Sequence, residues 1–167
     1  MSFEDKDVKW EPMTDRQALG LVQYALETDG APLVRRFGAA GAIALVMAIG
    51  SRETLWGAVE DKKGDGFGLM QVLPDSHYWN GLNPWDITHH VRAGVRHLVD
   101  ELNVIPATVP KSFQLLAVAL GFNGGLRRAE WLASGGKAGK RPVIENVQYM
   151  ADVVLNRMPK YLPKGVA

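Results

Sequence analysis

The chain has 167 residues, and its 47% hydrophobic and 22% charged residues are typical of a folded globular domain rather than a disordered chain. A net charge of +1 is too even to favour nucleic acid as the main partner. The sequence has no cysteine, which excludes disulfides and thiolate metal sites. No group of His, Asp and Glu has the spacing of a zinc site. We therefore expect one monomeric domain without metal or cofactor.

The first 13 residues, MSFEDKDVKWEPM, are read as an N-terminal extension of this domain. They lack the basic start and the apolar stretch of a secretory signal. The longest run of small and apolar residues, 38–50, is too short for a membrane span and fits a buried helix. We expect synthesis in the cytoplasm without a signal peptide, and no membrane insertion.

The first half of the chain predicts three helices and one irregular segment. Thr14 is the expected N-cap of a helix that ends near Gly30. A short helix over 32–37 should precede a longer one over 39–54, which is apolar on nearly every side and belongs inside the domain. Residues 57–85 are rich in Gly, Asp, Asn and Pro, so any short strands belong there.

The second half predicts further helices and completes a mainly α fold. A helix should open at Asp86 or Thr88. After a linker over 105–110, Ser112 is expected to cap a strongly apolar helix. A final helix runs over 143–158, and its inner face should carry Val147, Met150, Val154 and Met158.

One acid is out of place at the end of the most apolar helix. Glu53 follows Ile49 and Gly50 at spacings of four and three, so it shares a helix face with buried residues. A carboxyl group there is partly removed from water, which disfavours its charged form. A carboxylic acid that stays protonated near neutral pH can act as a general acid. The alternative is a structural salt bridge with Arg52 or another cation.

Two later segments carry side chains that suit sugar binding. In GDGFGLMQV, residues 64–72, the glycines indicate backbone that passes close to a ligand or to a helix end. In FNGG, residues 122–125, an aromatic ring and an amide end a buried helix. Amides exchange hydrogen bonds with sugar hydroxyls, and aromatic rings stack on the apolar faces of sugars.

The order of five segments resembles the goose-type lysozyme and soluble lytic transglycosylase superfamily, glycoside hydrolase family 23. The segments are SRETLWG, GDGFGLMQV, NPWDITHHVRAGVRHLVDEL, ALGFNGGLRRAE and NVQYMADVVLNRM, and they span roughly residues 40–158. The first two are most similar to goose-type lysozymes, whereas Pro74 and RAGVRHL look more like the transglycosylases. The resemblance implies a lysozyme-like, mainly α domain with a small β element, and a single catalytic domain over 1–167.

The resemblance also implies an activity. It implies a peptidoglycan-degrading muramidase that cleaves the β-1,4 bond between N-acetylmuramic acid and N-acetylglucosamine, with Glu53 as the catalytic acid. Phe67 and Met70 would anchor the GDGFGLMQV loop in the core, and Gln71 would face the cleft. The substrate-binding residues that it implies are Gly68, Leu69, Met70, Gln71, Phe122, Asn123 and Tyr149.

The chain departs from the family pattern at two positions. Phe122 stands where the family usually has Tyr, which removes one hydroxyl near the acid. Leu73 stands where some goose-type enzymes have Asp. Hydrolysis with inversion needs a second carboxylate, roughly 6.5–9.5 Å from the acid, to activate water. Asp65 and Asp61 are the remaining candidates, although Asp in a Gly-Asp-Gly turn often serves the turn alone.

Several alternatives stay open at this point. Without a second carboxylate, the 6-hydroxyl of the sugar would attack, and a lytic transglycosylase would leave 1,6-anhydro ends. A chitin-cleaving relative and a glycan-binding module without turnover are further alternatives. The missing signal peptide and the small size favour a phage endolysin or a virion-borne lysozyme that reaches the cell wall after release.

Two groups of charged residues are interpreted as surface features. His90 lies four residues after Asp86, which suggests an exposed charge pair. A basic cluster is read as a solvated face, with attraction to the anionic cell wall as the next interpretation. Its members are Arg127, Arg128, Lys137, Lys140 and Arg141.

Overall fold

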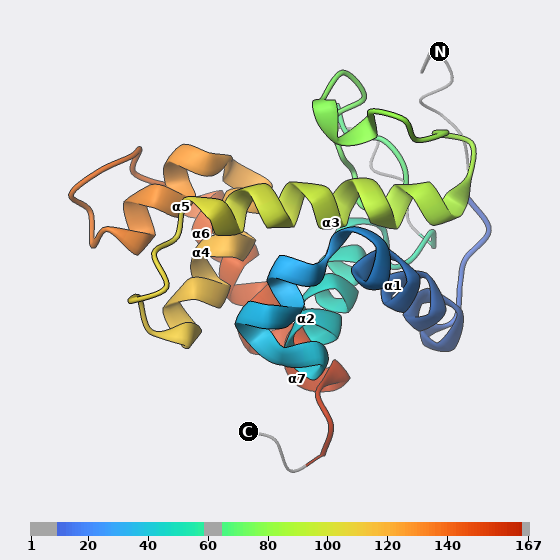
Figure 1. Ribbon diagram of the computed structural model, residues 1–167, viewed down its shortest axis with the longest axis horizontal. Coiled ribbons are helices and arrows are strands. Elements are labelled where there is room, and N and C mark those ends of the chain that lie inside the picture. The colour runs from blue at the N-terminus through green and yellow to red at the C-terminus, as the bar shows by residue number, and fades with distance from the viewer. Residues whose placement is uncertain (1–9, 59–64, 165–167) are drawn as a thin grey trace.

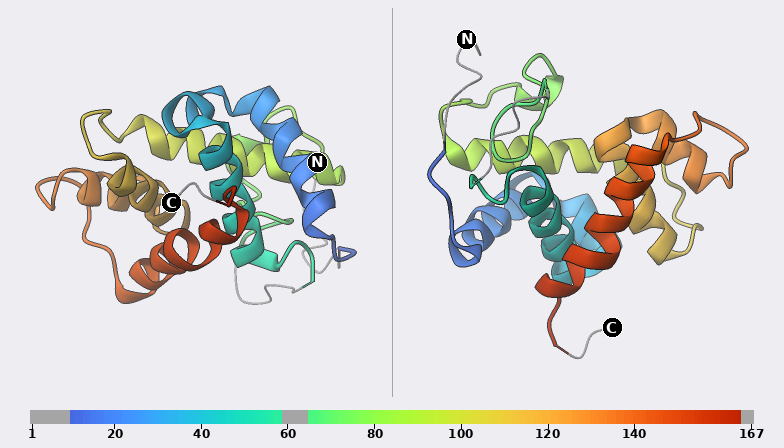
Figure 2. Two further views of the ribbon diagram at one scale, coloured as in Figure 1. Left: turned by 90° about the horizontal axis from the view of Figure 1, so that it is seen from below. Right: turned by 180° about the vertical axis from the view of Figure 1, so that it is seen from behind.

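A computed structural model describes residues 10–58 and 65–164, so the candidate Asp61 lies outside the described residues. Those residues are mainly helical, which confirms the mainly α part of the predicted fold class. Their buried apolar side chains form one hydrophobic core that draws on every part of the described chain. Figure 1 shows α3, Ile87–Asn103, running across the molecule, with the irregular residues 65–86 on one side of it and α1 and α2 on the other. The view from behind in Figure 2 agrees.

The first two helices follow the predicted pattern, with one kink in place of a break. α1, Asp15–Asp29, begins after Thr14, whose hydroxyl accepts a hydrogen bond from the Gln17 amide at 3.3 Å. α2, Ala31–Thr54, joins the two predicted helices. Gly38 kinks it with φ 76° and ψ 163°, a conformation that suits glycine. The kink therefore lies at the predicted boundary between the helices over 32–37 and 39–54, but the two form one continuous helix.

α2 is the central helix of the domain and contacts α1, α3, α4, η2 and α7. Its side chains are fully or almost fully buried from Ala44 to Gly50. Among the described residues, it is also the helix whose length and composition would suffice to cross a membrane. Half of its most apolar window is buried inside the protein, and the core helix of a soluble protein passes the same test. The absence of membrane insertion stays a prediction.

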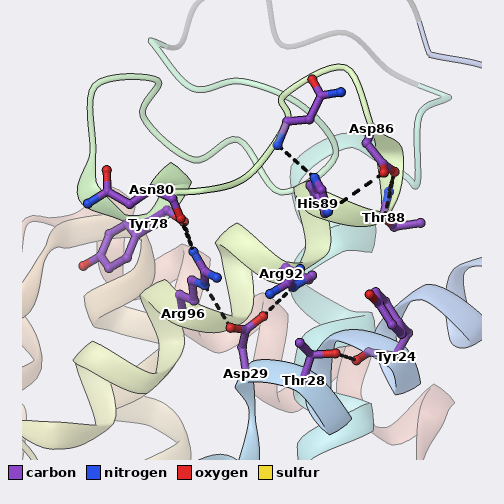
Figure 3. Close-up of polar contacts among 11 residues, drawn as sticks. Tyr24, Thr28, Asp29, Tyr78, Asn80, Asp86, Thr88, His89, Arg92 and Arg96 are labelled. Atoms are coloured by element: carbon purple, nitrogen blue, oxygen red, sulfur yellow. Dashed lines mark hydrogen bonds and ion pairs between the residues drawn. The ribbon is translucent and has the colours of Figure 1, made fainter. Parts of the chain in front are cut away.

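An ion-pair network fixes α3 to the end of α1 and to the irregular segment (Figure 3). The carboxylate of Asp29 accepts hydrogen bonds from Arg92 at 2.6 Å and from Arg96 at 2.9 Å. Arg96 also donates to the backbone carbonyls of Tyr78 and Asn80. Burial alone would raise the pKa of Asp29, but the two arginines outweigh it and lower that pKa below its ordinary value. This network holds the irregular segment over α3.

The second half of the chain forms a second group of helices beside α2 and α3. α4 spans Lys111–Gly124 and α5 spans Leu126–Ala133. The prediction that Ser112 caps α4 is wrong, because the helix begins one residue earlier, after Pro110. Pro110 has a fixed φ that suits a helix start, so the chain enters the helix without a side-chain cap.

The last helical stretch contains a π-helical segment. α6 spans Ile144–Ala151, η2 spans Asp152–Arg157 with π-helical hydrogen bonds, and α7 spans Met158–Tyr161. Of the predicted inner face, Met158 lies in the core, Met150 and Val154 pack against the core while half-buried, and Val147 is not part of it. Asn146, Tyr149 and Val153 are buried, while Val147, Met150 and Val154 are half-buried. The face is rotated because Asn146 and Tyr149 point toward polar partners on α4 and α2 rather than toward apolar ones.

The irregular segment is organised around a buried histidine. His90 is 1% exposed, its Nδ1 accepts from the Leu69 amide at 3.3 Å, and its Nε2 lies 2.6 Å from the Pro84 carbonyl. The predicted exposed pair with Asp86 is therefore wrong, and His89 is the residue that approaches Asp86, at 3.9 Å. Trp10, from the predicted extension, packs edge-on against the His90 ring. The short 3₁₀ helix η1, His77–Trp79, completes this lobe.

Candidate functional site

A cleft of about 680 Å³ lies where the end of α2, the irregular segment, α3 and the α4–α5 corner meet. Its walls carry polar, aromatic and basic side chains. The lining residues that bear on its chemistry are Glu53, Gln71, Leu73, Tyr78, His97, Glu101, Phe122, Asn123, Arg127, Arg128 and Lys140. The cleft therefore contains the predicted acid and, in all, residues from four of the five segments that carried the family resemblance.

Glu53 lines the cleft and is hydrogen-bonded to a buried tyrosine, Tyr149. The hydroxyl of Tyr149 donates a hydrogen bond to Glu53 Oε1. Tyr149 is only 4% exposed, and burial, followed by the nearby Glu53 carboxylate, raises its pKa well above the ordinary value. The phenol therefore stays protonated and remains a donor to Glu53. The sequence placed these two residues in one site, and the structure brings them into contact.

Ion pairs of Arg52 and Arg157 with Asp152 hold the end of α2 next to Glu53 and Tyr149. Arg52 lies over the Tyr149 ring, with its guanidinium carbon 5.3 Å from the ring centre, and pairs with Asp152 at 3.1 Å. Arg157 also binds Asp152, at 2.8 Å, and donates to the backbone carbonyl of Ser51. These contacts join the last turn of α2 to η2 and fix the backbone on which Glu53 is carried.

Residues 65–72 of the GDGFGLMQV segment fold into a tight turn beside Glu53. Phe67 and Val72 exchange backbone hydrogen bonds of 3.0 and 3.2 Å, which close the turn as an isolated antiparallel bridge. Gly68 has φ 72°, and a β-carbon there would lie 2.6 Å from His90 Nδ1. At Gly66 an added β-carbon would collide with the Gln71 carbonyl. The glycines thus let the turn pack against itself and against His90.

The turn separates buried anchors from one cleft residue. Phe67 and Met70 are buried and Gln71 lines the cleft, in the arrangement that the sequence predicted. Leu69 is also fully buried, and neither it, Met70 nor Gly68 lines the cleft. The Gln71 amide nitrogen donates to the Gly68 carbonyl at 2.8 Å, while its Oε1 is buried and has no hydrogen-bond partner among the described residues.

Phe122 and Asn123 lie at the end of α4, on the opposite wall. Phe122 is 8% exposed and packs against the His97 ring at 4.6 Å between ring centres. Asn123 is exposed, and its Oδ1 accepts a hydrogen bond from Asn146 at 2.8 Å. This bond orients the Asn123 amide and leaves its nitrogen as a donor for an acceptor in the cleft.

The predicted second carboxylate is not supplied by Asp65. Asp65 is exposed and is absent from the cleft lining, whereas its neighbour Gly66 belongs to it. Leu73 lines the cleft at the position where an acid would have faced it. Asp61 lies outside the described residues. Among the described residues, neither position 65 nor position 73 therefore offers a carboxylate to the cleft.

Sequence reasoning missed two residues that line the same cleft. Glu101 has a side chain with 0% exposure, and its Oε1 lies 3.2 Å from His97 Nε2. A signal was available, because Glu101 follows Leu98 at a spacing of three on the apolar face of α3. The reasoning that identified Glu53, an acid on a buried helix face, applies equally to Glu101.

The arrangement offers acid–base chemistry and polar recognition in one cleft. Glu53 and Glu101 bring carboxyl groups, His97 an imidazole, and Gln71 and Asn123 amides. Among the described residues, no cluster of three or more His, Asp or Glu side chains could hold a metal ion. Comparison with protein-family models gives no match, and comparison with curated proteins gives none either.

Proposed function

We propose that this chain is a muramidase with a lysozyme-like fold that cleaves the β-1,4 bond between N-acetylmuramic acid and N-acetylglucosamine in peptidoglycan. The observation that carries the proposal is the position of Glu53, which lies in the last turn of the central helix α2, lines the cleft and accepts a hydrogen bond from Tyr149. The order of the sequence segments supports the same proposal, since they supply Glu53, Gln71, Asn123 and Tyr149 in turn.

In the proposed reaction, Glu53 gives its proton to the glycosidic oxygen as the bond to the anomeric carbon breaks. The Tyr149 hydroxyl then stabilises the carboxylate that forms, because it is a neutral donor already in place. The Asn123 amide nitrogen would donate a hydrogen bond to the substrate, and the Gln71 side chain would contact the substrate from the same cleft. Both amides lie on the same cleft as Glu53, so they can orient the glycan against the acid.

Hydrolysis with inversion is the favoured outcome in the proposal, and transfer to the sugar's own 6-hydroxyl is the alternative. One observation favours the alternative, namely that Asp65 lies outside the cleft lining and Leu73 occupies the acidic position of goose-type enzymes. A lytic transglycosylase needs no water-activating carboxylate, since Glu53 can act first as acid and then as base. The chemical form of the new sugar end separates the two reactions.

The proposal is tested by the rate at which purified peptidoglycan is solubilised by the wild type and by Glu53→Gln. Glutamine keeps the size of the side chain but has no acidic proton, so we expect the rate to fall by about 10²- to 10⁴-fold. Glu27→Gln is the matched control, because Glu27 is an exposed acid on α1 that does not line the cleft. Retention of full activity by Glu53→Gln would overturn the proposal.

A further inference from the structure

The packing between α3 and α4 is arranged around the buried carboxyl of Glu101. Its Oε2 is buried without a hydrogen-bond partner among the described residues. A β-carbon at Gly121 on α4 would overlap this oxygen, so a glycine at that position makes room for the carboxyl. Burial raises the pKa of Glu101, and the hydrogen bond with His97 opposes that shift. Burying a carboxyl at this cost suggests a task other than packing.

His97 is the partner that Glu101 holds in the cleft wall. The imidazole lies between the ring of Tyr78, at 4.6 Å and 21°, and the ring of Phe122, at 4.6 Å and 33°. Its side chain is 18% exposed and lines the cleft, whereas Glu101 behind it has no exposed surface. Two stacked rings and one hydrogen bond fix the orientation of the imidazole. With Nε2 directed at Glu101, Nδ1 is the ring nitrogen left for another partner.

The described cleft contains few groups that could accept a proton near neutral pH. Besides the cations, its titratable residues are Glu53, Tyr78, His97 and Glu101. Burial and the nearby Asp100 and Glu101 raise the pKa of Tyr78, so its phenol stays protonated. Glu53 serves as the acid in the proposed reaction, and the Glu101 side chain, although it borders the cleft, has no exposed surface and is paired with His97. Among these groups, His97 is therefore the one left that could accept a proton from water.

We propose that His97, oriented by Glu101, is the base that activates water for hydrolysis in this cleft. The inference rests on the proposed muramidase function. The water oxygen forms a bond to the anomeric carbon, and its proton passes to the free ring nitrogen of His97. The bond to the glycosidic oxygen breaks, its electron pair stays on that oxygen, and Glu53 supplies the proton that it takes up. Glu101 is a positioning residue, since its carboxylate accepts the Nε2 hydrogen bond of the imidazolium.

Other charged groups surround the pair and are the background for its pH dependence. Asp100 and Glu101 lie on α3 itself, and His77 and Tyr78 lie on η1, where His77 pairs with Asp100 at 2.9 Å. Glu53 and the cationic residues Arg127, Arg128 and Lys140 line the same cleft. The pH profile must therefore be compared between variants rather than read from the wild type alone.

The test measures peptidoglycan cleavage rates and the new sugar ends released by the wild type and by His97→Gln. Glutamine cannot act as a base near neutral pH, so we expect kcat for fragments with reducing ends to fall by about 10²-fold or more. His77→Gln is the matched control, because His77 is a largely exposed histidine that does not line the cleft. Its kcat should stay within about twofold of the wild type.

Two more variants distinguish chemistry from packing. The double variant His97→Phe, Glu101→Leu keeps the row of stacked rings and removes the buried carboxyl, so it should fold yet lack hydrolysis. Glu101→Gln keeps an acceptor for His97 but removes the negative charge that stabilises the imidazolium. The acid limb of its kcat/KM profile should therefore shift to lower pH, an effect that a purely structural role would not produce.

The outcomes separate the inference from the function on which it rests. Reducing ends from the wild type, their loss in His97→Gln and in the double variant, and the shifted acid limb would support the inference. Wild-type hydrolysis that both His97 variants retain would overturn it, as would loss of hydrolysis in Asp61→Asn while His97→Gln stays active. Wild-type fragments with only 1,6-anhydro ends would overturn the role of His97 as the base that activates water, but would leave Glu53 as the proposed acid. No fragments from the wild type would overturn both.

Discussion

The hydroxyl of Tyr149 donates a hydrogen bond to the proposed acid, Glu53. A hydrogen bond to a charged group contributes about 1.5–3 kcal/mol, and each 1.4 kcal/mol is a factor of ten in rate. Tyr149→Phe removes this bond and leaves the ring under Arg52 in place. We therefore expect kcat to fall by about tenfold to a hundredfold, with KM little changed, in steady-state assays on soluble glycan fragments.

The control for this variant is Tyr24→Phe, since Tyr24 is an exposed tyrosine on α1. It should keep the wild-type kcat. An unchanged kcat in Tyr149→Phe would show that the acid does not need this donor.

His90 links the stability of the domain to pH at the scale of one side chain. Burial lowers its pKa from the ordinary 6.5 to about 4. Between these values the unfolded chain binds a proton that the folded protein does not, so the free energy of unfolding decreases as the pH falls. The contribution amounts to about 3 kcal/mol over that range and is fully present above pH 6.5.

Urea unfolding at pH 7, 6 and 5 measures this dependence. In His90→Gln the side chain stays neutral at every pH, so the part of the slope that His90 causes should disappear. His89→Gln, at the neighbouring half-buried histidine, should keep the slope. Equal slopes in the wild type and His90→Gln would contradict a neutral, buried His90.

At the scale of elements, two glycines of the irregular segment provide a matched pair. Gly68 and Gly81 have nearly the same φ, 72° and 71°. A β-carbon at Gly68 would lie 2.6 Å from His90, whereas one at Gly81 would meet nothing within 4 Å. Gly81→Ala should cost about 1 kcal/mol for the left-handed backbone alone. Gly68→Ala should cost about 1–3 kcal/mol more, because it also displaces the turn.

Thermal and urea unfolding of the two variants check this expectation. The turn carries Gln71 into the cleft, so Gly68→Ala should also lower activity, while Gly81→Ala should not. Equal destabilisation by both variants would show that the contact with His90 does not constrain the turn.

The elements themselves were predicted well where local chemistry decides them. The Thr14 cap and the Asp86 start of α3 follow from hydrogen bonds between residues close in sequence. The rotation of the last helix was not predictable, because it depends on contacts of Asn146 and Tyr149 with α4 and α2. The periodicity of apolar residues predicts the helix face that packs against hydrophobic residues. The partners of Asn146 and Tyr149 are the polar residues Asn123 and Glu53, which this pattern does not predict.

At the scale of the whole molecule, the candidate site was predicted in part. Glu53, Gln71 and Asn123 line one cleft, as the order of the sequence segments suggested. The place of Asp65 outside the cleft depends on how its turn is oriented, which sequence spacing does not specify. The pairing of His97 with Glu101 has a local signal at a spacing of four. The position of the His97 ring beside Phe122 depends on how α3 packs against α4, which the sequence does not specify.

The central claim, that Glu53 is the acid of a muramidase, is tested most directly by mass spectrometry of the soluble fragments from purified peptidoglycan. The account predicts fragments from the wild type whose new reducing or 1,6-anhydro ends are N-acetylmuramic acid, and a fall of about 10²-fold or more in their yield with Glu53→Gln. Equal fragment yields from both proteins, or wild-type fragments whose new reducing ends are N-acetylglucosamine, would contradict it.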